Sequence, residues 1–343
     1  MVYKSVAHRI ATLEDAGDAI GRWRLFLYVG AAMRYVLKRL LYLIPILFGI
    51  TFVSFAMMSA AGGDIVTQKL QNAGRVASRE TIAAARHELG LDRPFLVQYL
   101  AWLKGALRGD LGKSFLSGRD VFATFASKLP ATAYLAAVSL ALTAIISIPL
   151  GVLSAAYRGS AFDRAVRLCS FAGNSLPNFF TALLLMYFFS IKLKVLPAFS
   201  VGVSARGVAL PAATLAIAMS AKYLRQVRAA VLDELSKDYV VGAVARGVRF
   251  STILIFGVLR SCAATLITLF ALSAGSLLGG VAIVESIFMW DGVGRLAVSA
   301  INMRDYPMIQ AYVMWMAIIY VCVNLIADVL CRAADPRIRE AER

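Results

Sequence analysis

The sequence predicts an all-α polytopic membrane protein with six transmembrane helices and a cytoplasmic loop between the fourth and the fifth. The first observation is composition: 60% of the residues are hydrophobic and the mean hydropathy is +0.72, whereas soluble domains contain about 45–50% apolar residues. The second is a set of long charge-free runs, most of which exceed the roughly 20 residues that cross a hydrocarbon core. The third is the distribution of Lys and Arg between these runs.

Each charge-free run predicts one span. The fourth run, which starts at Val208, is too short to cross alone, so we expect its helix to continue past Lys222, whose long side chain can reach the interface. A long outside loop, residues 64–128, follows the first span, and residues 222–260 form the loop between the fourth and fifth. The predicted spans are residues 40–63, 129–157, 168–191, 208–226, 261–284 and 306–327.

Residues 1–32 form an N-terminal extension, and residues 33–339 form the predicted transmembrane domain. The apolar stretch 25–33 is too short to span a bilayer, and it lacks the small-residue cleavage pattern of a signal peptide. Two interpretations stay open. Translation starts at Met33, or the extension is cytoplasmic and lies on the bilayer surface.

The basic residues orient the spans, because short cytoplasmic loops are enriched in Lys and Arg. With the N-terminus inside, the cytoplasmic pieces hold 21 of the 36 Lys and Arg residues, and the two short outside loops hold 5. The loop 64–128 holds the others, but it is long enough to cross regardless of charge. Both termini and the loop 222–260 are therefore predicted to be cytoplasmic. The net charge of +16 is mostly an orientation signal, so we expect no nucleic-acid partner.

Cysteine and histidine usage excludes several kinds of site. The four cysteines lie in spans or at their cytoplasmic ends without metal-site spacing, so we expect no disulfide and no structural zinc. His8 and His87 are too few for a His-rich catalytic metal centre. The stretch Gly109–Ser114 comes close to a nucleotide-binding loop, but the glycine required five residues before Gly112 is replaced by Leu107. We expect no catalytic residue, no metal and no cofactor bound by this chain.

The loop 222–260 is predicted to contain a short helix with a stop signal. Ser236 or Asp238 can cap its start. Gly247 can supply the left-handed residue after its end, with Arg246 near the negative end of the helix dipole. The small side chains near this end would let another protein approach closely. The loop therefore suits docking onto a soluble partner.

Five motifs occur in a fixed order along the chain: Leu89–Pro94, Gly109–Ser114, Ser175–Phe179, Gly292–Leu296 with Arg304–Gln310, and Asp335–Arg339. They resemble an integral-membrane permease subunit of a type I ABC importer, in the dipeptide, oligopeptide and nickel branch. The loop Glu234–Gly247 is similar to the coupling motif of that family. The resemblance runs from about Met33 to Arg339, and five motifs in order are more specific than any one of them.

The resemblance implies a half-channel of the bacterial inner membrane that works with partners in the lipid bilayer and outside it. These partners are a second homologous permease, two ATPase subunits that bind the cytoplasmic loops, and a periplasmic or lipid-anchored binding protein that delivers substrate. ATP hydrolysis then belongs to the partners, so the chain itself is not expected to be an enzyme. The residues implied for ATPase coupling are Glu234, Asp238, Tyr239, Ala243, Ala245, Arg246 and Gly247.

Several polar and small residues at span depth line the pathway or pack the helices, and both readings stay open. The Gly275-x-x-x-Gly279 pattern allows close approach of another helix. Asn324 can make an inter-helix hydrogen bond or line a pore. The third-span motif adds Ser175, Pro177 and Asn178.

The last outside loop is predicted to receive substrate through four outer-mouth residues: Trp290, Arg295, Arg304 and Asp305. The alternative for the last two is an ion pair with a structural role. The predicted substrates are di- and oligopeptides, with nickel or a metal chelate second, because Ala297–Ile301 resembles nickel-importing members. A gated channel or a membrane enzyme is a remote alternative, since the spans lack paired carboxylates or another catalytic set.

Overall fold

The structure, a computed structural model, describes residues 37–39, 41–60, 79–88, 90, 92–200 and 202–334. The chain divides into two units, Met1–Phe48 and Gly49–Arg343, and each is described by itself. The predicted extension 1–32 and the motif Asp335–Arg339 lie outside the described residues. The division into an extension and a transmembrane domain therefore stays a prediction.

The all-α prediction is confirmed. The described residues contain no named strand, only an isolated bridge between Lys113 and Asp120. Five helices are long and apolar enough to cross a membrane, and a bent pair of helices makes a sixth candidate. The first candidate span is Leu37–Ala60. The elements that follow are α3 (Arg79–Glu88), α4 (Phe95–Ala106), α5 (Val121–Ala156), α6 (Ala161–Ser175), α7 (Asn178–Leu185), the π-helix η1 (Met186–Lys192), α8 (Ala205–Leu235), α9 (Asp238–Ala245), α10 (Phe250–Thr252), the π-helix η2 (Ile253–Val258), α11 (Leu259–Ile287), α12 (Val293–Asn302) and α13 (Tyr306–Ala334).

The third span is not the straight helix predicted over residues 168–191. It consists of α6 followed by α7 and η1, with a bend of 104° between them. The reason is Pro177, because the residue before a proline is driven out of the helical region. Leu176 accordingly adopts φ −81° and ψ 128°, and Pro177 is the N-cap of α7. The motif that includes Ser175 and Asn178 therefore marks the break in this span.

The loop predicted over residues 222–260 is mostly helix. α8 continues beyond Lys222 to Leu235, and the segment leads through α9, α10 and η2 into α11. The continuation has a physical cause, because Val227 and Val231 lie on one face of α8 and are fully buried. Their burial stabilises the helix beyond the apolar run, so a polar sequence forms a helical extension of the span.

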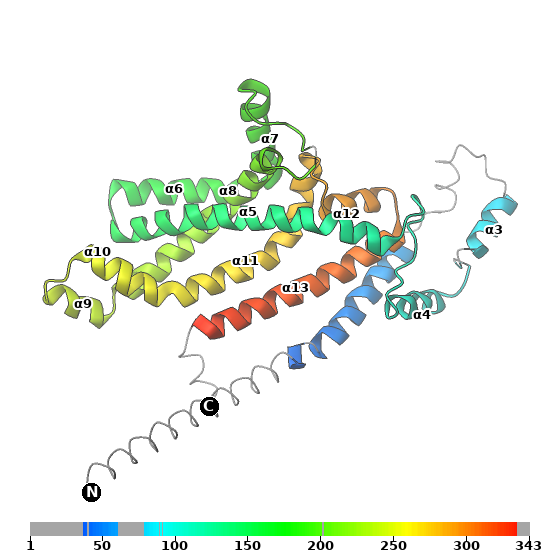
Figure 1. The fold of residues 1–343 in the computed structure, drawn as a ribbon, viewed down its shortest axis with the longest axis horizontal. Helices are drawn as coiled ribbons and strands as arrows, with labels where there is room; N and C mark the ends of the chain where they lie inside the picture. The colour runs from blue at the N-terminus through cyan, green and yellow to red at the C-terminus, as the bar shows by residue number, and fades with distance from the viewer. Residues whose placement is uncertain are drawn as a thin grey trace, which may run out of the picture. The chain divides into compact units, whose positions relative to one another are not determined.

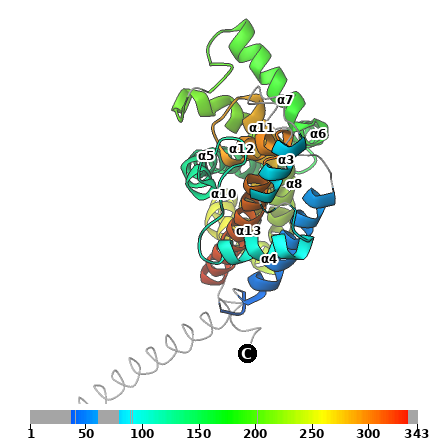
Figure 2. The ribbon, with the colours of Figure 1, turned by 90° about the vertical axis from the view of Figure 1, so that its right-hand side faces the viewer.

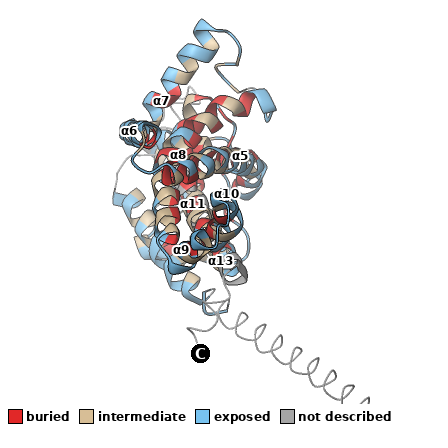
Figure 3. Ribbon diagram, turned by 90° about the vertical axis from the view of Figure 1, so that its left-hand side faces the viewer, coloured by how far each residue is buried: buried red, intermediate tan, exposed pale blue. Residues whose placement is uncertain are grey.

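The tightest helix pair is α5 against α8. A Cβ atom at Gly151 would lie 2.8 Å from Val227 Cβ and 3.0 Å from the carbonyl oxygen of Leu224, so only glycine fits there. Small buried polar residues continue this face of α5, and some donate to their own helix; Ser139, for example, donates to the Leu135 carbonyl at 2.7 Å. Buried positions gather where α5, α8 and α11 meet, whereas α7 is mostly exposed (Figure 3).

The long helices of the second unit run between two ends. The turn from α5 to α6 lies at one end, together with α9 and α10, and α12 lies at the other (Figure 1). We call these the coupling end and the outer end. Figure 2 looks onto the outer end, where α12 lies near α5 and α11. The arrangement agrees with the alternating spans predicted from the sequence.

Candidate functional site

At the coupling end, α9 stops where the sequence predicts. Gly247 has φ +77°, its N–H donates to the Val244 carbonyl at 2.9 Å, and the Val248 N–H donates to the Ala243 carbonyl at 3.2 Å. This pair of bonds is the Schellman arrangement, which satisfies the last carbonyls of a helix. Arg246 is the C-cap residue.

The predicted caps at the start of α9 are wrong. Lys237 is the N-cap residue and makes no side-chain capping bond. The Ser236 hydroxyl donates backwards to the Asp233 carbonyl at 2.7 Å, so it is not available to α9. Asp238 lies inside the first turn, where its charge favours the positive end of the helix dipole.

One face of α9 rests on the bundle and the other is exposed. Val240 is buried in a cluster that includes Val227, Val231 and Ile253, and Ala243 packs against that cluster. The opposite face is exposed, and so is the end of the helix. The exposed residues there are Val241, Val244, Ala245, Arg246 and Gly247. The structure therefore separates the predicted coupling residues into an inward one, Ala243, and an exposed set.

Glu234 and Tyr239 connect α8 to α9. The Glu234 side chain is largely buried and accepts from Lys237 Nζ at 2.5 Å. A Cβ at Gly257 in η2 would lie 3.6 Å from the Tyr239 ring, so the ring packs against that turn. Burial of the hydroxyl, reinforced by the neighbouring Glu234 carboxylate, raises the pKa of Tyr239. These two residues hold α9 in place against its neighbours.

Sequence reasoning missed an ion pair close to this end. Asp163 is 1% exposed, and Arg228 grips its carboxylate with both prongs, Nε at 2.8 Å and Nη2 at 2.9 Å. Both residues were counted only as loop charges that orient the spans. Their separation of 65 positions leaves no local pattern that would reveal the pair.

Among the pathway-or-packing residues, Gly275 has a packing role. A Cβ there would lie 3.0 Å from the Tyr320 ring and 3.4 Å from Asn324 Oδ1, so glycine lets α11 approach α13. Asn324 Oδ1 is buried and has no hydrogen-bond partner among the described residues. Gly279 lies within α11. Ser175 Oγ donates to the Phe171 carbonyl at 2.9 Å within α6.

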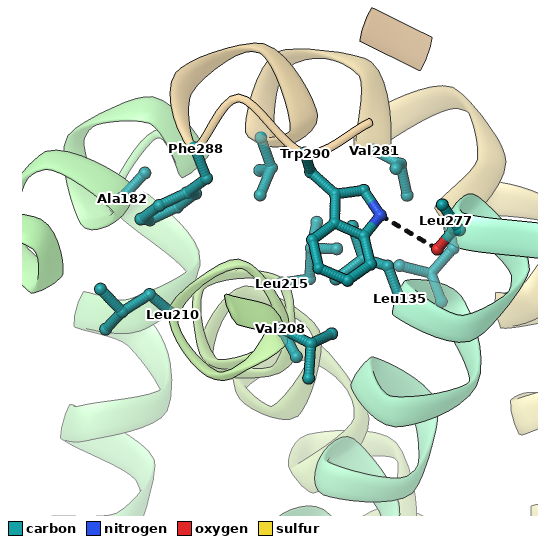
Figure 4. Packing of buried hydrophobic residues seen from close by; sticks show 12 residues of the cluster. Leu135, Ala182, Val208, Leu210, Leu215, Leu277, Val281, Phe288 and Trp290 are labelled. Carbon is teal, nitrogen blue, oxygen red and sulfur yellow. Dashed lines mark hydrogen bonds between the residues drawn. The ribbon is translucent and has the colours of Figure 1, made fainter. Parts of the chain in front are cut away.

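At the outer end, Trp290 is not exposed to a passing substrate. It is 1% exposed and packs in a core cluster with Leu135, Val281 and Phe288, and its indole N–H donates to the Ala131 carbonyl at 3.0 Å (Figure 4). Trp290 therefore fastens the turn after α11 to α5. The loop predicted from Glu285 to Asp305 is also largely helical, because α11 ends at Ile287 and α12 occupies Val293–Asn302.

Glu285 is the second residue that sequence reasoning missed. It is fully buried, and its carboxylate accepts from Thr132 Oγ1 at 2.6 Å and from the backbone N–H of Arg295 at 2.9 Å. The Thr132 hydroxyl oxygen in turn accepts from the Val293 N–H at 2.9 Å. Glu285 and Thr132 thus satisfy amide groups that the start of α12 leaves without intrahelical partners.

The remaining outer-mouth residues also make structural contacts. The Arg295 guanidinium donates to the Met289 carbonyl at 2.8 Å, next to a residue with φ +53°. Asp305 is 5% exposed; its carboxylate accepts from the Ser114 hydroxyl and from the Phe115 N–H, the latter at 3.1 Å. Gly109–Ser114, rejected above as a nucleotide-binding loop, therefore docks onto the start of α13. Arg304 has φ +55° after the end of α12.

No group of three or more His, Cys, Asp and Glu side chains that could hold a metal ion occurs among the residues that the structure describes. The geometry is that of a helical membrane bundle with an exposed short helix at one end and a fixed cap at the other. It offers surfaces and helix contacts for transport, and neither end presents a catalytic constellation in the part described.

Comparisons with known proteins agree with this geometry. Residues 147–340 match the family described as binding-protein-dependent transport system inner membrane component, and residues 32–136 match its N-terminal family. The oligopeptide transport system permease protein AppB of Bacillus subtilis is 38% identical over 314 residues, which cover 89% of this chain and 98% of the relative. The glutathione transport system permease protein GsiC of Pectobacterium atrosepticum is 36% identical over 307 residues, covering 90% and 99%.

A solved structure, the inward-facing MetNI methionine ABC transporter, matches with a TM-score of 0.53 at 16% identity. The match covers 62% of this chain and 96% of that chain. At this identity it shows a shared fold and nothing about substrate.

Proposed function

Because this chain belongs to the family of binding-protein-dependent transport system inner membrane components, we propose that it forms half of the import pathway for di- and oligopeptides in an ATP-driven transporter. As a multi-pass inner-membrane permease, it works with a second homologous permease, two ATPase subunits and an extracytoplasmic binding protein. The partners bind and hydrolyse ATP, and the chain itself binds no cofactor.

The observation that carries this proposal is the way α9 is held. One face packs through Val240 against the bundle, and the opposite face, with Val241 and Val244, is open to a partner. α9 follows α8 after only two residues. A push on α9 therefore reaches a helix that runs through the whole bundle, which is what ATP-driven switching requires.

The outer end supports delivery from outside. Glu285 and Trp290 fix α12 and the preceding turn to α5, and Asp305 fixes the start of α13 to the loop after α4. A fixed cap of this kind gives a binding protein a rigid surface to dock on. Arg295 is partly exposed there, and we retain it as the residue that receives substrate.

Peptide is the substrate that the relatives favour, since their names refer to oligopeptide and glutathione transport. Nickel or a metal chelate is the second outcome of the test. A deletion strain that cannot make leucine should fail to grow on a leucine-containing dipeptide while growing on free leucine. Uptake of radioactive nickel should be unchanged. Loss of nickel uptake with intact growth on the dipeptide would make the metal the substrate.

The proposed orientation, with both termini cytoplasmic, has its own test. In a cysteine-free variant, a single cysteine at Ser236 should react with a membrane-impermeant maleimide only after the membrane is opened. A cysteine at Ser117, in the loop before α5, should react in intact spheroplasts. Both positions are exposed, so side-chain burial does not limit labelling. Labelling of the Ser236 position from outside would reverse the topology and remove the basis for coupling through α9.

A further inference from the structure

Three elements meet at one buried carboxylate near the coupling end. Asp163 is the third residue of α6 and accepts from Ser154 Oγ of α5 at 2.6 Å and from the Gly159 N–H of the connecting turn at 3.0 Å. Arg228 of α8 donates to both carboxylate oxygens. Paired, charge-assisted bonds of this kind fix direction as well as distance. We call this set, Ser154, Gly159, Asp163 and Arg228, the clamp.

The clamp lies next to the part of α8 that leads to α9. Arg228 precedes the end of α8 at Leu235 by two turns, a distance of about 10 Å at about 1.5 Å per residue. Val227 and Val231 lie on either side of it in sequence and belong to the cluster that also holds Val240 of α9. A displacement of α9 therefore reaches Arg228 through a short and well-packed piece of helix.

α6 is fastened to α8 a second time, farther along. Ser170 Oγ donates to the Ala221 carbonyl, and a Cβ at Gly173 would lie 3.2 Å from Ala221 Cβ. Just beyond this contact, α6 ends at Ser175 and the chain turns by 104° into α7. α6 is thus tied to α8 at both ends, and the break before Pro177 is the first place where the third span can move separately.

We propose that the Asp163–Arg228 clamp makes α6 and α8 one rigid lever that carries ATPase-driven movement from α9 to the break in the third span. The inference rests on the proposed function and adds two positioning residues to it. Neither residue contacts substrate or nucleotide in this scheme. Their role is to make α6 follow α8, so that work done at the coupling end reaches the transport pathway.

Stability alone would also explain a buried ion pair, so the test needs a matched control. Arg167 provides one, because its Nε lies 3.6 Å from the same Asp163 oxygen but belongs to α6 itself. Arg167→Ala removes one positive charge beside Asp163 and leaves the link to α8 intact. Arg228→Ala removes the same charge and cuts the link. Arg228→Lys keeps the charge and loses the two-pronged grip, which provides a milder variant if Arg228→Ala folds poorly.

The experiment uses the whole transporter in proteoliposomes, with its binding protein and radiolabelled trialanine as the transport probe. For Arg228→Ala we expect trialanine accumulated per ATP hydrolysed to fall by at least about fivefold, the low end of usual coupling factors, while hydrolysis itself persists. Arg228→Lys should give an intermediate ratio, and Arg167→Ala should match the wild type.

A distance measurement separates this inference from the proposed function and needs no substrate. Spin labels at positions 168 and 233, exposed on α6 and α8, should give one narrow distance in the wild type, with and without ATP and vanadate. In Arg228→Ala, the distribution should broaden in the trapped state. An unchanged distribution and an unchanged transport ratio would overturn the clamp as a lever, as would equal losses in Arg167→Ala. A wild-type complex that hydrolyses ATP without moving any peptide would instead overturn the proposed peptide import.

Discussion

Gly247→Trp is expected to abolish co-purification of the ATPase subunits while the protein still inserts in the membrane. Gly247 lies at the exposed end of α9, and a Cβ built there meets no atom within 4 Å. The chain therefore has room for an indole, and the clash would fall on the docked partner. The measurement is recovery of the ATPase subunits with an affinity-tagged permease, compared at equal membrane content.

Backbone strain must be separated from bulk at this position. Gly247 has φ +77°, and a residue with a Cβ costs roughly 1–2 kcal/mol in the left-handed region. Gly247→Ala introduces that cost without the bulk, so it should retain most of the ATPase recovery. Gly247→Asn should do at least as well, because asparagine tolerates this region better. Equal loss in the Ala and Trp variants would show that helix termination matters and that close approach does not.

The structure also changes which variant best tests docking. Ala243 packs against the cluster around Val240, whereas Ala245 is exposed at the same end of α9. A glutamate at position 243 would place a charge against that apolar cluster and disturb the seat of α9. A charge at position 245 would meet only the partner. The two positions thus separate the seating of α9 from the surface that it presents.

The spans could be predicted from the sequence because bilayer thickness imposes a length on every charge-free run. The stop at Gly247 could be predicted because it depends on a local conformation that glycine adopts readily. The bend of the third span was not predicted, although Pro177 was noted. A proline fixes the conformation of the residue before it, but the angle between α6 and α7 depends on where each helix packs.

The two buried carboxylates could not be found by any local rule. Asp163 meets Arg228 across 65 positions, and Glu285 meets Thr132 across 153. Each was read as a loop or span-end charge, since composition cannot distinguish a solvated carboxylate from a paired one. The glycines of the Gly292–Leu296 motif show the same limit. Their spacing supported the family resemblance, but the side chain that requires glycine there lies on α11.

That side chain leads to the second large effect expected, a substantial loss of stability in Gly292→Ala. A Cβ at Gly292 would lie 2.2 Å from Glu285 Oε1 and 2.4 Å from Thr132 Oγ1, far inside contact distance. Glu285 cannot move aside freely, because it is fully buried and hydrogen-bonded to Thr132 and to the Arg295 N–H. Each buried partner left unsatisfied costs about 1–3 kcal/mol.

The measurement is the melting temperature of the purified protein in detergent, together with the amount recovered from the membrane. Gly49→Ala is the matched control, because a Cβ there meets nothing within 4 Å, and it should melt like the wild type. Glu285→Ala removes the clash partner but leaves the Thr132 hydroxyl and the start of α12 unsatisfied, so it should also melt several degrees lower. Glu285→Gln keeps one accepting oxygen and should lose less. If Gly292→Ala melted with the wild type, the close contact between α11 and the start of α12 would be wrong, and Glu285 would not hold α12 in place.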